Sequence, residues 1–247
     1  MDRLVYTAAS GLKAHMASQA AIANNIANVN TTGFRADRVV FDRLSVTGPG
    51  FEARVPASEQ VIDADRKAGA MMQTGRPLDV AVTGDAWIAV QAPDGSEAYT
   101  RRGDLSVNAS GVLETGDGHP VMGSGGPITL PPYQKVSIGS DGSVSIVPQG
   151  STDGAAQVID TIKLVSTQGT DTAKGLDNLL YVKGGGVLPQ DMEAQVTGGA
   201  LEGSNVDMTQ ALVDMIENQR AYEVQANLLK EAKNMDESSA SVMRMPS

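Results

Sequence analysis

The chain has 247 residues, 41% of them hydrophobic and only 4% aromatic, and its formal net charge is −10 at pH 7. This length and apolar content are enough for a buried core in one or two domains, whereas the acidic balance argues against a nucleic-acid interface, which needs clustered Lys and Arg. The sequence has no cysteine, which excludes a disulfide framework, a thiol nucleophile and a Cys-ligated zinc site.

The N-terminal stretch MDRLVYTAASGLKAHMASQ predicts neither a membrane span nor a cleavable leader. Its apolar block is interrupted by Lys13, His15 and Gln19, unlike the continuous apolar region of a signal peptide. No apolar run in the sequence approaches the roughly 18 residues expected of a membrane span. We therefore expect a cytoplasmic protein, or one exported without a cleaved signal peptide.

The first segment, residues 1–31, has a heptad pattern. Steps of three and four residues connect eight positions of the segment, which are Val5, Ala8, Leu12, His15, Gln19, Ile22, Ile26 and Val29. Such a pattern predicts one long amphipathic helix with a seam for a partner helix. Gly33 lies just beyond, where a residue able to adopt positive φ would end the helix.

Four asparagines occur within seven residues near the end of this segment, at Asn24, Asn25, Asn28 and Asn30. Asn is a mediocre helix former, because its amide competes for nearby backbone groups. A neutral amide can nevertheless be buried without the desolvation cost of a charge, and it both donates and accepts hydrogen bonds. Our hypothesis is that Asn24 and Asn28 lie on a face that is buried in a polymer of helices. The alternative is a polar helix end exposed to solvent.

The middle of the chain, residues 76–189, predicts an all-β domain. Alternating apolar residues flank Asp141-Gly142, Asp94-Gly95 lies between WIAVQAP and SEAYTR, and Ser110-Gly111 suggests a third turn; such pairs are typical of β-hairpins. The residues expected to seed the core are Leu78, Val80, Val82, Trp87, Ile88 and Val90. Residues 32–75 and 190–203 are mixed and polar, and we expect them to be extended connectors.

The last segment, residues 204–247, again has a helical seam, formed by Met208, Leu212, Met215, Gln219, Tyr222, Ala226 and Leu229. Ser204 and Asn205 supply oxygens suited to the N-cap of this helix. Two long seams at opposite ends of a β domain require partners, so each helix should pack on the other, on other copies or on other proteins. The predicted fold class is α+β, with long N- and C-terminal helices that pair as an antiparallel coiled coil.

We find no catalytic constellation in the sequence. One histidine, His15, lies in the helix seam, where it is interpreted as a packed polar residue, and the other, His119, lies in a turn. The GSGG stretch at residues 123–126 lacks the glycine that a nucleophile elbow would need at position 122. The sequence therefore predicts a protein that is not an enzyme, with no cofactor and no metal site.

The two ends of the chain carry motifs that are similar to a known family. The stretch ANNIAN at residues 23–28, followed by TTGFR at 31–35, resembles the N-terminal signature of bacterial flagellar rod and hook proteins. The stretches SNVD at 204–207 and MIENQRAYE at 215–223 resemble the C-terminal signature of the same family. The resemblance covers nearly the whole chain and is strongest to proximal-rod members.

The resemblance implies a structural subunit of the flagellar basal-body rod, in which terminal helices line a hollow, torque-transmitting shaft. It also implies export through the flagellar type III apparatus, a periplasmic location in the rod, and its own copies and other rod proteins as partners. The residues that we expect at the assembly interface are Val5, Leu12, Ile22, Asn24, Asn25, Ile26, Asn28, Val29, Gly33, Phe34, Asn205, Val206, Leu212, Met215, Ile216, Gln219, Arg220, Tyr222 and Leu229.

Two other functions stay open at this point. Within the same family, the chain could be a distal-rod or hook subunit. From a different class, it could be a secreted β-domain protein that binds a ligand or degrades peptidoglycan, which would require a ligand site or a pair of catalytic carboxylates.

Overall fold

A computed structural model describes residues 2–43, 57–151 and 154–243 of the chain. The chain forms two compact units. The helical unit comprises Met1–Ala27, Asp37–Ile62 and Asp207–Ser247, and the β unit comprises Asn28–Ala36 and Asp63–Val206.

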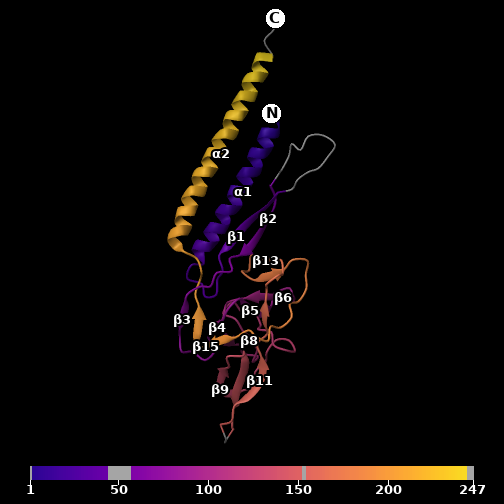
Figure 1. Cartoon of the computed structure of the whole chain (residues 1–247), viewed down its shortest axis with the longest axis vertical. Helices are drawn as coiled ribbons and strands as arrows, with labels where there is room; N and C mark the ends of the chain where they lie inside the picture. Colours follow the sequence, from indigo (N-terminus) through magenta and orange to yellow (C-terminus); the bar gives the residue numbers. More distant parts are fainter. Residues whose placement is uncertain (1, 44–56, 152–153, 244–247) are drawn as a thin grey trace. The chain divides into compact units, whose positions relative to one another are not determined.

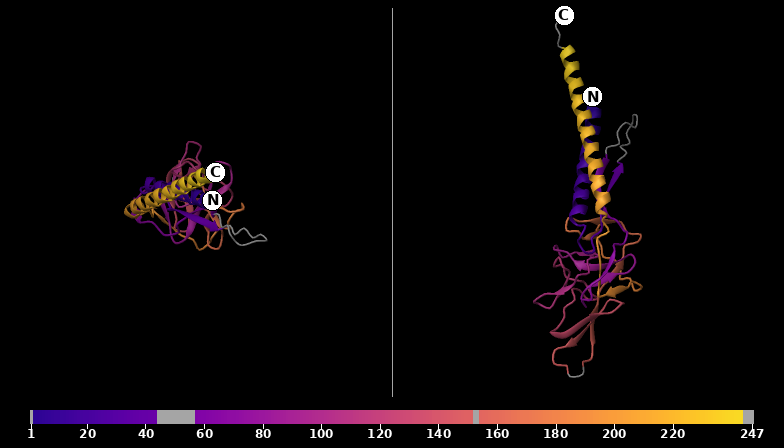
Figure 2. Two further views of the ribbon diagram at one scale, coloured as in Figure 1. Left: turned by 90° about the horizontal axis from the view of Figure 1, so that it is seen from above. Right: turned by 90° about the vertical axis from the view of Figure 1, so that its left-hand side faces the viewer.

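The helical unit contains two long helices and a pair of strands. Helix α1 (Asp2–Ala27) and helix α2 (Met208–Met243) run side by side in opposite directions, as Figures 1 and 2 show. Strands β1 (Asp37–Arg43) and β2 (Ala57–Ala64) form a two-stranded sheet, in which the last residues of β2 already belong to the β unit. Within the described residues, neither helix is long and apolar enough to span a bilayer.

Both helices are shorter than the segments predicted for them. Helix α1 ends at Ala27, so Asn28 and Val29 lie beyond it and cannot extend its seam. Helix α2 begins at Met208, because the carboxylate of Asp207 accepts hydrogen bonds from the backbone N–H groups of Thr209 (2.8 Å) and Gln210 (3.1 Å). Asp207 is therefore the N-cap, in the place expected of Ser204 or Asn205.

The β unit is built from several small antiparallel sheets. The largest sheet has the order β12-β5-β6-β14-β13, a three-stranded sheet has the order β11-β10-β9, and the pairs β15-β4, β16-β3 and β7-β8 complete the unit. The strands are β3 (Met71–Gln73), β4 (Val80–Val82), β5 (Ala86–Gln91), β6 (Glu97–Thr100), β7 (Ser106–Val107), β8 (Leu113–Glu114), β9 (Tyr133–Ile138), β10 (Ser143–Pro148), β11 (Gln157–Thr161), β12 (Leu164–Ser166), β13 (Thr172–Lys174), β14 (Leu180–Val182), β15 (Val196–Gly198) and β16 (Ala200–Glu202).

Strand β5 contains the sequence WIAV, in which apolar residues do not alternate with polar ones. Successive side chains of a strand point to opposite faces of the sheet, and both faces of β5 are buried. Ile88 and Val90 join the larger apolar cluster, whereas Trp87 and Ala89 join a second cluster on the other face. The predicted core is confirmed, since Val80, Val82, Trp87, Ile88 and Val90 are all buried and Leu78 packs against them.

The three predicted hairpin turns are confirmed. Gly95 connects β5 to β6, Gly111 connects β7 to β8, and Gly142 connects β9 to β10, each at positive φ. A glycine adopts this conformation without the clash that a Cβ would cause.

The predicted fold class is wrong, although its central β domain is supported. The chain is α+β in composition but mostly β sheet, with α1 and α2 the only helices in the described residues. The segments predicted to be extended connectors contain paired strands, because β3 pairs with β16, and β15 pairs with β4 of the predicted β domain. The predicted coiled-coil seam of α2 is also displaced, as described below.

Candidate functional site

The contact between α1 and α2 is made by small and polar side chains. The amide of Asn218 accepts a hydrogen bond from His15 Nδ1 (2.8 Å) and donates to the His15 carbonyl (2.9 Å) and to Gln19 Oε1 (2.8 Å). Nearer the other end, Gln225 reaches the carbonyl of Ala8 (3.5 Å). Asn218 and Gln225 therefore face α1, whereas Leu212 and Gln219 of the predicted seam are exposed, and Met215 and Leu229 of the same seam are half-buried.

α2 carries a row of exposed apolar side chains outside its contact with α1. At 100° per residue, Leu212, Val213, Ile216 and Val224 lie about 120–160° around the helix from Asn218, whereas Leu228 and Met235 lie about 80–100° from it. Leu212 is 46% exposed, Ile216 is 53% exposed and Leu228 is 58% exposed. We call this row the outer stripe of α2, and its members are Leu212, Val213, Ile216, Val224, Leu228 and Met235. So many exposed apolar side chains on one helix mark an interaction surface.

Two of the asparagines at the end of α1 bind the start of β1. Asn25 Oδ1 accepts a hydrogen bond from the Asp37 backbone N–H (2.7 Å), and Asn25 Nδ2 donates to the Asp37 carbonyl (3.2 Å). Asn24 Nδ2 donates to the Asp37 carboxylate (2.6 Å). The side chain of Asn25 thus pairs with the backbone as a peptide group of a neighbouring strand would, and it fixes where the chain leaves the helix.

A buried ion network in the β unit connects segments from both ends of the sequence. The carboxylate of Glu202 lies 2.6 Å from Arg35 Nη2 and 3.0 Å from Arg101 Nε, and it accepts a hydrogen bond from the Gly69 N–H (2.7 Å). The side chains of Arg35, Arg101 and Glu202 are only 4%, 2% and 2% exposed. Burial lowers the pKa of both arginines, and the charge of Glu202 opposes that shift.

The backbone on either side of Arg35 is held in place by further contacts. The N–H of Gly33, at φ 67°, donates to the Glu202 carbonyl (2.7 Å), and a Cβ at this position would collide with the backbone of Arg101. Lys174 Nζ donates to the Arg35 carbonyl (2.7 Å) and lies 3.7 Å from the centre of the buried Phe34 ring, a cation–π geometry. Gly33 therefore admits the close approach that the network requires.

Asn205 joins the two terminal motifs directly. Its Oδ1 accepts a hydrogen bond from the Ala36 N–H (2.7 Å), and its Nδ2 donates to the Lys67 carbonyl (2.9 Å). Its own N–H donates to the Phe34 carbonyl (3.3 Å). We call this arrangement, together with Gly33, Arg35, Arg101 and Glu202, the signature junction.

The predicted interface residues fall into three groups. Gly33, Phe34 and Asn205 lie in the signature junction, and Asn24 and Asn25 lie at the α1–β1 turn, so they have structural partners within the chain. The exposed members are Leu212, Ile216, Gln219, Arg220 and Tyr222, and the half-buried members are Leu12, Ile22, Ile26, Asn28, Val29, Val206, Met215 and Leu229. Val5 is within α1, but its side chain lies outside the described residues.

Sequence reasoning missed four residues that organise these sites: Asp37, Arg101, Glu202 and Asn218. No local pattern marks Asp37, Arg101 or Glu202, because each acts on a residue far away in the sequence, whereas Asn218 lies within the MIENQRAYE stretch. The sequence of α2 contained one signal of its polar contact with α1. This signal was the presence of the polar residues Asn218 and Gln225 in a helix with a weak apolar pattern. Among the described residues, no group of His, Asp and Glu side chains is arranged to hold a metal ion.

Comparison with known proteins places this architecture in a family. Three family models match the chain, namely the flagella basal body rod protein model at residues 5–35, the flagellar hook protein FlgE/F/G D1 domain at 81–146, and the flagellar basal body rod FlgEFG protein C-terminal model at 197–242. These matches contain the TTGFR motif, the core strands of the β unit and the Asn205 motif, respectively.

Relatives that match over nearly the whole chain are also flagellar rod proteins. The chain is 37% identical to the flagellar basal-body rod protein FlgF of Salmonella typhimurium and 37% identical to FlgF of Escherichia coli, with 93% of each chain covered in both cases. It is 34% identical to FlgG of Bacillus subtilis, over 93% of this chain and 94% of the relative.

The chain therefore belongs to the family of flagellar basal-body rod proteins and is a structural subunit of the rod. Its higher identity to these two FlgF proteins than to the Bacillus FlgG favours FlgF over the other rod and hook members.

Proposed function

We propose that the chain polymerises in the rod through the outer stripe of α2, which packs against helices of neighbouring subunits. The exposure of Leu212, Ile216 and Leu228 supports this proposal. Burying an apolar side chain of this size contributes about 1.5–3 kcal/mol, so a row of them can drive assembly. The polar contact with α1 leaves this stripe available.

The neighbours are other copies of this chain and other rod proteins, and their packed helices form a hollow shaft that transmits torque. Torque requires that each chain resist deformation. The signature junction supplies that resistance within the β unit, because Glu202 and Asn205, in the segment before α2, bind Arg35 and Ala36, in the segment after α1. The other exposed residues of the predicted interface, which are Gln219, Arg220 and Tyr222, take part in the same assembly.

The chain must also reach the rod before it can assemble there. We infer that it is exported through the flagellar type III apparatus, without a cleaved signal peptide, and that it assembles in the periplasm. The division into segments 1–31, 32–75, 76–189, 190–203 and 204–247 is retained as a proposal for five functional regions: two assembly segments, two connecting segments and an outer β domain. No step of this function requires catalysis.

A pair of substitutions tests the proposed assembly surface. Ile216→Asp places a charge on the outer stripe, so it should abolish rod assembly and motility, while the purified full-length variant keeps the thermal transition of its β unit. Ile216→Leu keeps the apolar character and is the matched control, which should assemble normally. Motile cells with complete basal bodies that carry Ile216→Asp would refute the proposal.

A further inference from the structure

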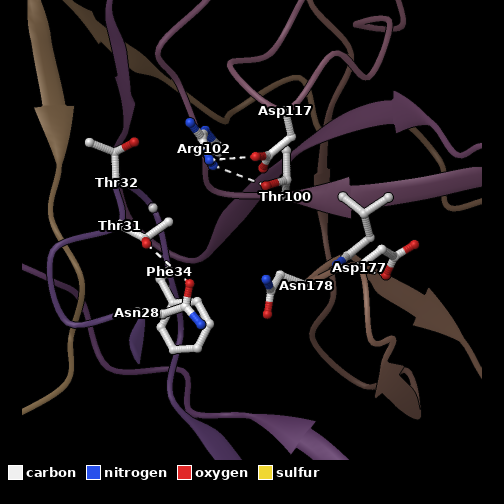
Figure 3. A pocket seen from close by; sticks show the side chains of 11 residues that line it. Asn28, Thr31, Thr32, Phe34, Thr100, Arg102, Asp117, Asp177 and Asn178 are labelled. Atoms are coloured by element: carbon white, nitrogen blue, oxygen red, sulfur yellow. Dashed lines mark hydrogen bonds and ion pairs between the residues drawn. The ribbon is translucent and has the colours of Figure 1, made fainter. Parts of the chain in front are cut away.

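Polar side chains around the pocket beside the TTGFR motif pair with one another, as Figure 3 shows. Arg102 Nη1 donates to the Asp117 carboxylate (2.6 Å), and Thr31 Oγ1 donates to Asn28 Oδ1 (3.1 Å). A partner can reach unpaired groups more readily on the backbone, at the edges of the sheets.

Two edge strands of the β unit also expose large apolar side chains. In β3, Met71 is 54% exposed and Met72 is 46% exposed. In β11, Val158 is 65% exposed and Ile159 is 36% exposed. All other described strands of this unit keep such side chains buried or half-buried. The two strands lie apart, with β3 at the left flank of the unit and β11 near the bottom of Figure 1.

The outer edge of β3 has unpaired backbone groups. Ala70 and Thr74, which flank the strand, form backbone hydrogen bonds of 2.8 Å and 2.9 Å with the residues that flank β16. Residues that face the partner strand alternate with residues that face away from it. Met72 therefore faces β16, and the N–H and C=O groups of Met71 and Gln73 point outward. Within the described residues, nothing forms a hydrogen bond with these outward groups.

β11 has outward backbone groups at Val158. Ser143 of β10 accepts a hydrogen bond from the Gly139 N–H (2.8 Å), so its backbone faces β9. By the same alternation, Ile146 faces β11, and its partner Gln157 faces back toward β10. The next residue, Val158, therefore points its N–H and C=O groups away from the other strands of the sheet.

Other parts of these edges carry features that block pairing, whereas β3 carries none. Further along β11, Asp160 Oδ1 accepts a hydrogen bond from the outward N–H of Thr161 (2.7 Å). The edge strand β9 follows Pro131-Pro132 and contains Lys135. Proline and charge are means by which edge strands avoid pairing, and the sequence Met-Met-Gln of β3 has neither. β3 and the first half of β11, Gln157–Ile159, are therefore open to another strand.

We propose that β3 of one copy pairs with the first half of β11 of a second copy. A strand is the partner that satisfies the outward N–H and C=O groups of another strand. The flexible methionines of β3 can adapt to the branched side chains of Val158 and Ile159. A contact between two different surfaces of the same chain repeats from copy to copy in an open array. This contact rests on the assembly of copies proposed above, and it adds a β-sheet contact to that of the helices.

Cysteine pairs test the strand contact in assembled rods. The chain has no native cysteine, so Val158→Cys can be combined with Met71→Cys or with Gln73→Cys, and purified basal bodies that contain the variant can be oxidised with copper phenanthroline. Opposed residues of paired strands have Cβ atoms about 4.5–5.5 Å apart, near the separation that a disulfide bridges. We expect one of the two double variants to form a disulfide-linked dimer.

The single variants and a mismatched pair are the controls for this cross-link. Met71→Cys alone and Val158→Cys alone should give no dimer, and neither should Met71→Cys combined with Asp141→Cys, at an exposed turn. A dimer from Met71→Cys alone would mean that β3 pairs with its own copy, and it would overturn the role of β11. Assembled rods without a dimer from either double variant would refute the strand contact.

Lysine variants test the same contact without a cross-link. Met71→Lys and Val158→Lys each place a charge on an open edge, where lysine prevents pairing. Because both side chains are exposed, each variant should keep the native melting temperature but lose complete rods, whereas Met71→Leu should assemble normally. Normal rods with both lysine variants would contradict the strand contact. A cysteine dimer in rods that assemble normally with Ile216→Asp would instead contradict only the proposed contact of the helices.

Discussion

The carboxylate of Glu202 lies 2.6 Å from the guanidinium of Arg35, although the two residues stand near opposite ends of the sequence. Both side chains are almost completely buried, and Arg101 contacts the same carboxylate. A pair of this kind stabilises little relative to an apolar pair, but removing one partner is costly, because it leaves a buried charge without compensation. The network therefore makes the β unit depend on both terminal motifs.

Replacing Glu202 by glutamine should strongly destabilise the β unit. Glutamine keeps the shape but leaves Arg35 and Arg101 without a counter-charge, at a cost of about 3–5 kcal/mol. Chemical denaturation of the purified protein measures this loss. Asp141→Asn, which neutralises an exposed turn carboxylate, is the control and should change the free energy of unfolding by less than about 0.5 kcal/mol. Similar values for both variants would contradict the structural role of the network.

The hydrogen bonds between His15 and Asn218 should be energetically coupled. We expect a double-mutant cycle of His15→Ala and Asn218→Ala, followed by helical circular dichroism during denaturation, to give a coupling of about 0.5–1.5 kcal/mol. Gln219→Ala changes an exposed neighbour and should show no coupling to His15. If Gln219 were coupled to His15 and Asn218 were not, the α2 face assigned to the α1 contact would be incorrect.

Asn25 should protect the start of β1. Substitution by alanine removes the acceptor of the Asp37 N–H, so hydrogen exchange at this amide should accelerate by roughly tenfold, as expected for a loss of about 1 kcal/mol or more. Asn30→Ala, at an exposed position of the following turn, should leave the Asp37 exchange rate unchanged. Equal protection in the Asn25 variant would show that another group holds this strand.

Because of the buried phenol of Tyr99, we expect the folded protein to lose stability in alkaline solution. Burial raises the pKa of its phenol to about 12, where the hydroxyl accepts a hydrogen bond from the Leu188 N–H and donates to Glu97. Because the folded pKa exceeds the ordinary value of about 10, this contribution is complete below pH 10 and is lost as the pH rises through about 12.

The Tyr99→Phe variant separates this effect from general alkaline unfolding. It should be less stable than the native chain at neutral pH by about 1–3 kcal/mol, because the Leu188 N–H loses its acceptor. Its free energy of unfolding should then fall less steeply than that of the native chain between pH 10 and about 12. Tyr133→Phe, at a half-buried position, should keep the native slope. Identical slopes for Tyr99→Phe and the native chain would contradict the prediction.

Local chemistry explains which parts of the fold the sequence predicts. The turns at Gly95 and Gly142 depend on backbone conformations that glycine favours, and the burial of Ile88 and Val90 follows from their apolar side chains. Both kinds of information reside in neighbouring residues. The same is true of the family motifs at the two ends of the chain.

The features that were mispredicted are long-range. β3, β15 and β16 come from segments that show no strong alternation, so these segments resembled connectors, but β3 pairs with β16 and β15 pairs with β4. On α2, Leu212 fitted an ideal heptad, but the hydrogen bonds of Asn218 select a different face for α1. The contacts of Asn25 with Asp37 similarly give the asparagine-rich stretch a role within the chain, whereas its burial in a polymer stays a prediction.

Electron cryomicroscopy of purified basal bodies that contain this chain would test the central claim most directly. The account predicts that, in the rod, helices of neighbouring subunits cover Leu212, Ile216 and Leu228 on the outer stripe of α2. A rod in which this stripe faces solvent or the open lumen, with subunits joined through other surfaces, would contradict it.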